Sequence, residues 1–171
     1  MATKPITDLY ELCVADSVDT QDYEDGSVPF VTSAETNNGI VRYVSPKAGD
    51  KVFSGPCLVI SGLGFATVHT GMILPKGNGG DSCTVVYGKT PMSVSEYFSL
   101  AAVFNCLHKW RFTYGRKCGL NRLKDLEIPW PLPNIGNCLE NQDRLAAGCL
   151  DNLKKESNER SGSKKPELWA R

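Results

Sequence analysis

The sequence lacks long apolar runs and any excess of charge of one sign. No apolar stretch approaches the ~18 residues that span a bilayer, and Met1–Asp25 has neither the basic start nor the apolar core of a secretory signal. The 19 Lys and Arg balance the 19 Asp and Glu, for a formal net charge of +0. We therefore expect a cytoplasmic globular protein with no membrane partner.

Histidine is scarce, and the cysteines are scattered. The chain has seven cysteines, an odd number with no C-x-x-C pair, and only His69 and His108 could complete a metal site. Structural zinc sites and disulfide frameworks need closely spaced ligands or paired cysteines. The glycines at 62 and 64 follow a predicted strand, but the third glycine and the helix of a dinucleotide site are missing. We predict reduced thiols, no metal and no cofactor.

Motifs for catalysis are also missing. The chain has no D/N-P-P-Y/F/W motif of an amino-methyltransferase, and between Val28 and Pro133 its acids are scattered singly, unlike the carboxylate clusters of metal-dependent nucleases. Neither histidine stands in a nucleophile-elbow context. The sequence predicts a non-catalytic protein. A small DNA-modifying or hydrolytic enzyme stays open as an alternative that would require carboxylates or histidines to converge in three dimensions.

Basic residues are concentrated in one stretch, Phe104–Pro133, which has no acid before Asp125. Its six cations are Lys109, Arg111, Arg116, Lys117, Arg122 and Lys124. Residues 26–137 hold eleven bases against six acids, a net of five positive charges, whereas residues 1–25 hold seven acids against one base. A local excess of this kind is typical of phosphate binding, although the pI of about 6.7 is low for a nucleic-acid binder.

Turn residues mark the places where the backbone could approach a partner. Gly115 and Gly119 bracket Arg116 and Lys117, and Asn37-Asn38-Gly39 favours positive φ. The glycine-rich stretch 75–82, which includes Lys76 and Asn78, predicts either a DNA-contacting loop or a solvated hairpin tip. Trp110 and Phe112 are expected in the core.

Hydrophobic periodicity predicts a mixed α/β (α+β) fold: a single domain with a mixed, largely antiparallel β-sheet, one long packing helix and a short C-terminal helix. The strands are expected at 12–15, 28–32, 40–44, 57–61, 67–70, 72–74 and 83–87. The long helix is expected at 93–107, capped by Ser93 or Ser95, with an apolar stripe of Val94, Tyr97, Phe98, Ala101, Ala102, Phe104 and Leu107. A helical turn at 120–126 should then lead to a short strand and a stiff proline exit.

Two short motifs carry a resemblance to a known family. Tyr114-Gly115-Arg116, followed by Leu123-Lys124-Asp125-Leu126-Glu127-Ile128-Pro129-Trp130-Pro131, resembles the end of a target-recognition domain from the specificity (S) subunits of Type I restriction-modification systems. The stretch from Gly26 to Ser33, with Asn37-Asn38-Gly39-Ile40, is similar to the opening strand and turn of that domain. The resemblance covers roughly residues 5–135.

The resemblance implies a sequence-specific duplex-DNA recognition module, a half-size specificity subunit that is not itself catalytic. Its implied partners are double-stranded DNA, a methyltransferase (modification) subunit and a restriction subunit, with a homodimer or a second recognition domain to complete a split target. A protein-interaction module of the same fold that no longer reads DNA is the alternative. The expected organisation is a recognition domain at 1–135, a dimerisation or spacer helix at 136–157 and a flexible tail at 158–171.

The predicted DNA-binding residues combine the basic stretch with neighbouring loops. The six cations would contact phosphates, and one of the arginines could bind guanine in a bidentate manner. Arg116 is the preferred single candidate for DNA contact. Other loop residues would reach base edges: Tyr114, Asn37, Asn38, Lys76 and Asn78.

Overall fold

A computed structural model describes residues 2–79 and 82–133. All of them belong to one unit, Met1–Asn134, and the predicted helix at 136–157 and tail at 158–171 lie outside the described residues. The helices are α1 (Ile6–Leu9), α2 (Val94–Leu107) and α3 (Leu120–Lys124), with 3-10 turns η1 (Thr20–Asp22), η2 (Asn37–Gly39) and η4 (Lys109–Arg111). The strands are β1 (Thr3–Pro5), β2 (Tyr10–Val14), β3 (Asp25–Val31), β4 (Ile40–Val44), β5 (Phe53–Ser54), β6 (Cys57–Ile60), β7 (Ala66–His69), β8 (Met72–Pro75), β9 (Thr84–Gly88) and β10 (Glu127–Pro129).

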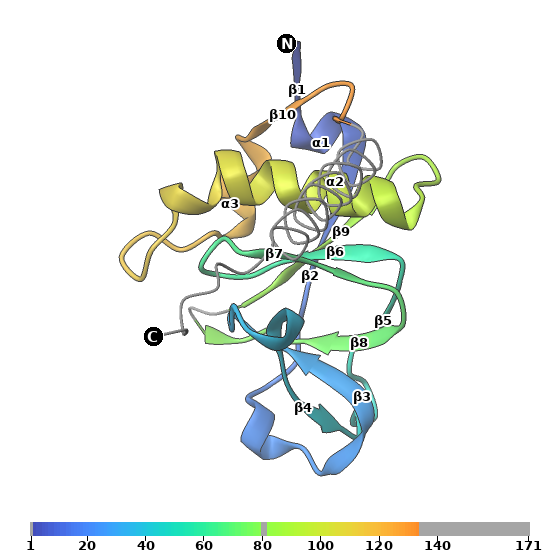
Figure 1. Cartoon of the computed structure of the whole chain (residues 1–171). Coiled ribbons are helices and arrows are strands. Elements are labelled where there is room, and N and C mark those ends of the chain that lie inside the picture. The colour runs from blue at the N-terminus through green and yellow to red at the C-terminus, as the bar shows by residue number, and fades with distance from the viewer. Residues whose placement is uncertain (1, 80–81, 134–171) are drawn as a thin grey trace, which may run out of the picture. The chain divides into compact units, whose positions relative to one another are not determined.

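Two four-stranded sheets form the body of the molecule (Figure 1). The first has the order β2-β9-β6-β7 and is antiparallel throughout. The second has the order β4-β3-β8-β5, in which only the β3–β8 pairing is parallel. The predicted mixed α/β class and the largely antiparallel pairing are confirmed, but the strands divide between two sheets where the sequence suggested one.

Strand β6 explains this division, because all four of its residues are buried. Successive side chains of a strand point to opposite faces, so Leu58 and Ile60 enter the core beneath α2, while Cys57 and Val59 enter the core that also contains Phe53 of the second sheet. A strand with apolar residues on both faces needs a layer on each side. The continuous apolar run at 57–60 is therefore the central layer of the fold.

Helix α2 covers the first sheet beside β6 and β7. It begins as predicted at Ser93, whose hydroxyl accepts from the Glu96 backbone N–H while the Glu96 carboxylate accepts from Ser93 N–H. The predicted stripe is only partly correct. Tyr97, Ala101 and Phe104 are buried, whereas four members of the stripe are exposed: Val94, Phe98, Ala102 and Leu107. The buried face instead includes Leu100 and Val103.

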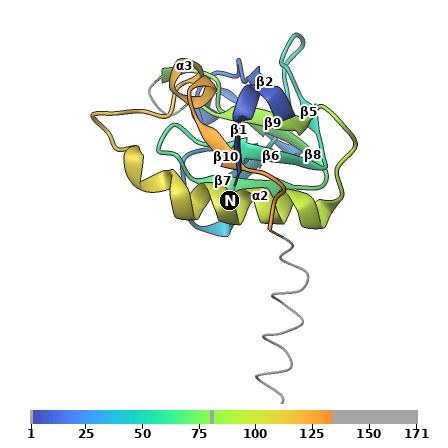
Figure 2. The same cartoon turned by 90° about the horizontal axis from the view of Figure 1, so that it is seen from above.

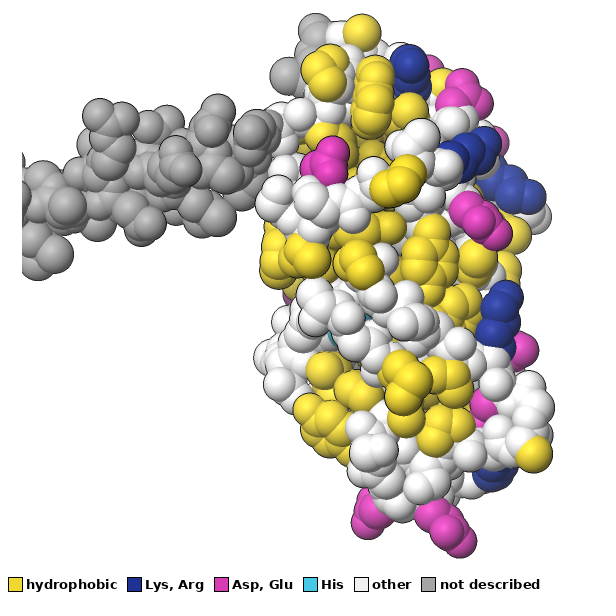
Figure 3. Space-filling view, turned by 90° about the vertical axis from the view of Figure 1, so that its right-hand side faces the viewer, with side chains coloured by type: hydrophobic (Ala, Val, Ile, Leu, Met, Phe, Trp, Pro, Cys, Tyr) yellow, Lys and Arg dark blue, Asp and Glu magenta, His cyan; other side chains and the backbone are white. Residues whose placement is uncertain are grey.

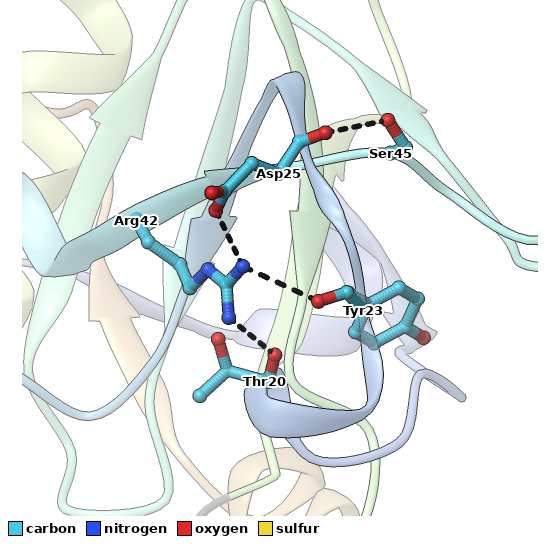
Figure 4. Close-up of polar contacts among 5 residues, drawn as sticks. All are labelled: Thr20, Tyr23, Asp25, Arg42 and Ser45. Atoms are coloured by element: carbon cyan, nitrogen blue, oxygen red, sulfur yellow. Dashed lines mark hydrogen bonds and ion pairs between the residues drawn. The ribbon is translucent and has the colours of Figure 1, made fainter.

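The acidic loop before β3 is held against the second sheet by Arg42 of β4 (Figure 4). Its guanidinium donates to the backbone carbonyls of Thr20 and Tyr23 at 3.1 and 3.2 Å and pairs with Asp25 at 2.6 Å. The Tyr23 ring packs on Phe30 at a centroid distance of 5.5 Å, in a third apolar cluster. Arg42 thus orders an acidic segment that would otherwise repel itself.

The first and last described strands pair with each other. β1 and β10 form a two-stranded antiparallel sheet in which Lys4 lies opposite Ile128. The Ile6 N–H donates to the Leu126 carbonyl at 2.9 Å, and Ile6, Leu123 and Ile128 are fully buried in the core beneath α2. The helical turn, short strand and proline exit predicted from the sequence are confirmed as α3, β10 and Trp130–Pro133.

Candidate nucleic-acid interface

The basic stretch folds as a chain of short elements that leaves its cations outside. After η4, Thr113 and Arg116 exchange backbone hydrogen bonds of 3.1 and 3.0 Å around Tyr114-Gly115, which makes a tight hairpin before α3. Phe112, Cys118 and Leu123 are 7%, 1% and 0% exposed, so these three side chains anchor the stretch in the core. In Figure 1 this hairpin projects at the left of the view, beside α3. We call residues 109–124 the basic segment.

A backbone contact fixes the base of the hairpin to the first sheet. The Cys118 N–H donates to the Gly62 carbonyl in the β6–β7 turn at 2.8 Å, and the Cys118 side chain is buried. Burial raises the pKa of the Cys118 thiol to about 12, so this cysteine stays neutral despite the cations around it. Its role is packing, and the hairpin beyond it is free to present its own side chains.

Two exposed aromatic rings each carry a cation on one face. Trp110 is 73% exposed, with the Arg111 guanidinium carbon 5.6 Å from its ring centre, and Tyr114 is 80% exposed, with the Lys117 Nζ at 4.2 Å. The indole N–H of Trp110 donates to the Leu107 carbonyl at the end of α2, at 2.9 Å. The expectation of a core Trp110 is wrong, whereas that of a core Phe112 is confirmed. Exposed rings beside cations suit base stacking and phosphate contact together.

Three arginines border a hollow of about 430 Å³ next to the hairpin. Arg122 donates to the Lys117 carbonyl at 2.7 Å and so braces the hairpin, while Arg116 has no ion pair among the described residues. The hollow is lined by Trp110, Arg111, Phe112, Arg116, Arg122, Asp125 and Leu126. Guanidinium groups at such a rim can hold a phosphate or the edge of a guanine. Asp125, the one acid that lines the hollow, lowers its net positive charge.

Two of the predicted cations are paired with distant acids. Lys109 forms a 2.7 Å ion pair with Glu35 and lies 4.8 Å from the centre of the Phe65 ring. Lys76 forms a 2.9 Å ion pair with Asp19, and its side chain is only 20% exposed. The positive charge offered to solvent is therefore carried mainly by the other members of the basic segment. Lys124 is exposed on α3.

The asparagines of the η2 turn adopt the conformation that the sequence predicted. Asn37 and Asn38 have φ of 50° and 54°, and Gly39 has 77°. Their side-chain amides donate to backbone carbonyls, Asn37 to Ile40 at 3.0 Å and Asn38 to Val68 at 2.8 Å. The Asn38 bond holds the turn against β7, and the Asn37 bond closes the turn onto the start of β4. Glu35 of the same loop pairs with Lys109 at 2.7 Å, so the loop lies beside the start of the basic segment.

The loop after β8 does not form the hairpin tip considered from the sequence, because β8 and β9 belong to different sheets. Lys76 is tied by backbone bonds to Val31 and Cys83 at 2.8 and 2.7 Å, and Gly77 donates to Ser17 at 3.1 Å. Asn78 is exposed beyond these anchors. The loop is thus attached to the end of β3, the strand that leads into the η2 loop.

Both histidines are buried and contribute no charge to this surface. The His69 Nε2 lies 2.9 Å from the Thr67 hydroxyl, and burial lowers the pKa of His69 to about 4. The His108 Nε2 lies 3.0 Å from the Glu127 carbonyl, and burial lowers the pKa of His108 from its ordinary value. Both rings are neutral near pH 7 and serve as packing groups.

The side of the molecule away from the hairpin differs from the basic segment. Figure 3 shows the side that faces right in Figure 1, away from the hairpin, where hydrophobic side chains occupy the middle and Lys and Arg lie along one margin.

Within the described ranges, no three His, Cys, Asp or Glu side chains are grouped to hold a metal ion. Nor does any helix in those ranges reach the length and apolarity of a membrane span.

Comparison with solved structures identifies the arrangement of these elements. No protein-family model matches the sequence, and no curated protein matches it significantly. The HsdS subunit from Thermoanaerobacter tengcongensis superposes with a TM-score of 0.56 over 96% of this chain, at 16% identity. The chain has the fold of a Type I specificity subunit. The Type I restriction-modification system S subunit from M. genitalium gives a TM-score of 0.55 over 91% of the chain, at 13% identity.

The resemblance inferred from the two short motifs is thereby confirmed at the level of the fold. This chain spans 40% and 41% of the length of the two S subunits, so it corresponds to less than half of either. In this chain the basic segment occupies the connection between α2 and β10, and connections of this kind often carry binding residues.

Proposed function

We propose that this chain is a DNA-recognition module of a Type I restriction-modification system, a half-size specificity subunit that acts in the cytoplasm. The observation that carries the proposal is the basic segment, with its exposed cations and aromatic rings, on a specificity-subunit fold. The module itself performs no chemistry. A methyltransferase subunit, and a restriction subunit where cleavage occurs, would bring the catalysis to the DNA that this chain selects.

Within the basic segment we assign two kinds of contact. Arg116 on the hairpin, with Lys124 and Arg122 on α3, would approach phosphates, because each carries its charge at an exposed position. The half-buried Lys117, whose Nζ lies 4.2 Å from the centre of the exposed Tyr114 ring, would add a phosphate contact beside that ring. Arg111 and Tyr114 would reach the bases, since a planar guanidinium and an exposed ring can bind base edges and faces. Asn37, Asn38 and Asn78 would extend the contact along the neighbouring loops.

The experiment measures fluorescence anisotropy on a randomised duplex pool across a salt series, followed by sequencing of the bound fraction. It compares wild type with Arg116→Ala/Lys117→Ala and with Lys47→Ala/Lys51→Ala, a control that removes two exposed lysines outside the basic segment. We expect the first variant to lose about tenfold in affinity and to flatten the log–log salt slope by about 1.8, for two phosphate contacts. The control should bind like wild type.

The outcomes separate the alternatives. An enriched sequence that disappears in Arg116→Ala/Lys117→Ala would support sequence-specific recognition. Equal losses in both double variants would mean that binding depends on overall charge and not on the basic segment. No binding by wild type in low salt would refute DNA recognition by the isolated chain and favour a protein-interaction module.

A further inference from the structure

A second hollow, of about 640 Å³, lies where the start of α2 meets α1, the start of β2 and the proline exit. Figures 1 and 2 show the chain after β10 turning toward α2 at this place. Small-molecule sites in proteins typically have volumes of about 300–1,000 Å³. We call this space the exit hollow. None of its described lining residues belongs to the basic segment, so it is separate from the candidate nucleic-acid interface.

The exit hollow is lined by a tyrosine whose hydroxyl has no partner. Tyr10, the first residue of β2, is 2% exposed, and its hydroxyl makes no hydrogen bond to any described residue. Buried polar groups are nearly always hydrogen-bonded, because an unpaired one loses its bonds to water without replacement. A tyrosine hydroxyl can accept a hydrogen bond as well as donate one. A ligand that bonds to Tyr10 would therefore remove an unfavourable contribution.

Glu96 of α2 brings a negative charge close to this hydroxyl. Burial, and next the charge of Glu96, raises the pKa of Tyr10 to about 12, yet the two groups share no hydrogen bond. The Glu96 carboxylate accepts from the Ser93 N–H and hydroxyl through Oε2 at 2.7 and 2.8 Å. These bonds lower the pKa of the Glu96 carboxyl, so it is ionised at neutral pH. A donor placed between the two side chains could bond to both.

The charges in the lining favour a cation over an anion. Asp8 and Glu96 stand against Lys89, a net of one negative charge, and none of the three forms an ion pair within the described residues. The start of α2 would otherwise attract an anion, but Glu96 already caps it. An ammonium group has three donors and no acceptor, which suits carboxylates and a hydroxyl oxygen.

The other walls of the exit hollow are largely apolar. Leu9, Met92 and Leu132 are half-buried and pack against the core beneath α2, and Trp130 is 37% exposed. Lys4, outside the lining, has its Nζ 5.5 Å from the centre of the Trp130 ring, so this ring already attracts a cation. Apolar walls of this kind suit a hydrocarbon or aromatic body, which an inorganic cation does not have.

We infer that the exit hollow binds a small primary amine with an apolar body, whose ammonium group donates to the Tyr10 hydroxyl oxygen and to the Glu96 carboxylate. The body lies against Leu9, Met92 and Leu132. This site goes beyond the proposed function, because it requires neither DNA nor any residue of the basic segment.

Three probes with the same phenyl ring test the ligand class on the full chain at neutral pH. Phenylethylamine carries a positive charge, phenylethanol is neutral and phenylpropanoate carries a negative charge. Titration followed by amide NMR gives each dissociation constant, and the amides of Leu9, Thr90 and Glu96 should shift. The amine should bind at least about tenfold more tightly than the other two, because hydrogen bonds between charged groups are stronger than neutral ones.

Two variants test the contacts. Glu96→Gln removes the charge but keeps a side chain that serves the same capping box, and it should weaken amine binding about tenfold. Tyr10→Phe removes only the hydroxyl and should weaken binding about threefold, without lowering the urea midpoint, since this hydroxyl has no described partner to lose. Glu24→Gln and Tyr43→Phe alter exposed residues outside the exit hollow, and these controls should bind the amine like wild type.

Several results would overturn the inference. Equal binding of the amine and the alcohol would show an apolar hollow without a charge preference, and tighter binding of phenylpropanoate would show an anion site. Unshifted amides at Leu9, Thr90 and Glu96, or an affinity unchanged in either Glu96→Gln or Tyr10→Phe, would also contradict it. A chain that binds DNA but not the amine would leave the proposed function standing, and a chain that binds the amine but not DNA would do the reverse.

Discussion

Gly64→Ala is expected to disturb the support of the basic segment from beneath. Gly64 lies in the β6–β7 turn with a φ of 77°, and a Cβ added there would lie 2.4 Å from Phe112 Cδ2 and 2.9 Å from Phe112 Cβ. Phe112 is the buried residue between η4 and the hairpin. The substitution would therefore force the Phe112 ring, and the chain that carries it, away from the first sheet.

The magnitude follows from two contributions to the free energy of unfolding. A left-handed conformation costs a non-glycine residue about 1–2 kcal/mol, and forcing extra atoms into a packed site costs about 1–3 kcal/mol. We expect Gly64→Ala to lose about 3 kcal/mol. Gly79→Ala is the matched control, because Gly79 has a φ of 70° but nothing within 4 Å of an added Cβ, and it should lose only about 1 kcal/mol.

Urea denaturation at neutral pH measures both variants, and the anisotropy assay then compares their affinity for DNA. Without urea, and at a temperature where both variants are folded, Gly64→Ala should also bind DNA more weakly than Gly79→Ala, because Phe112 holds Arg111 and the hairpin in place. Equal losses in the free energy of unfolding of the two variants would refute the reasoning, since they would show that the Phe112 ring can move away from the added methyl group without destabilising the fold.

Two further predictions concern the buried ring of His69 and the ion pair between Glu35 and Lys109. Burial lowers the pKa of His69 to about 4, whereas the unfolded chain keeps a value of about 6.5. The contribution of the neutral His69 to the free energy of unfolding should therefore be complete above about pH 6.5 and should fall by about 2 kcal/mol at pH 5. Urea unfolding at both pH values should show a smaller loss in His69→Gln than in wild type. Glu35→Gln releases Lys109 from its acid and should raise DNA affinity about threefold in low salt, with no gain in high salt; an unchanged affinity would place Lys109 outside the interface.

Local patterns were sufficient to predict most individual elements of the fold. Ser93 and Glu96 define the start of α2 through their side-chain chemistry, and Asn37-Asn38-Gly39 defines its turn through positive φ. The division into two sheets was not predictable in this way, because pairing of β3 with β8 joins residues more than forty positions apart. The orientation of α2 was also missed, because a helix with apolar residues on every side has no periodicity that distinguishes its inner face.

For the candidate site, the sequence identified the basic segment but not the charge that it presents. The acids that pair with Lys109 and Lys76 are Glu35 and Asp19, both in distant loops that only the folded chain brings close. Trp110 was assigned to the core because it is large and apolar, yet Phe112, two residues later, is the side chain that enters the core at this place. Its exposure next to Arg111 could have been suspected only from the density of cations around it.

The pairing of β1 with β10 has a consequence for how this domain could be combined with others. Thr3 lies opposite Pro129, so the polypeptide enters and leaves the described unit at neighbouring points. A domain with adjacent entry and exit can be inserted into a host protein, or exchanged for another of its kind, without stretching the chain on either side. In the proposed DNA-recognition role, this closure would allow the whole domain to be exchanged between proteins as one unit with its own intact core.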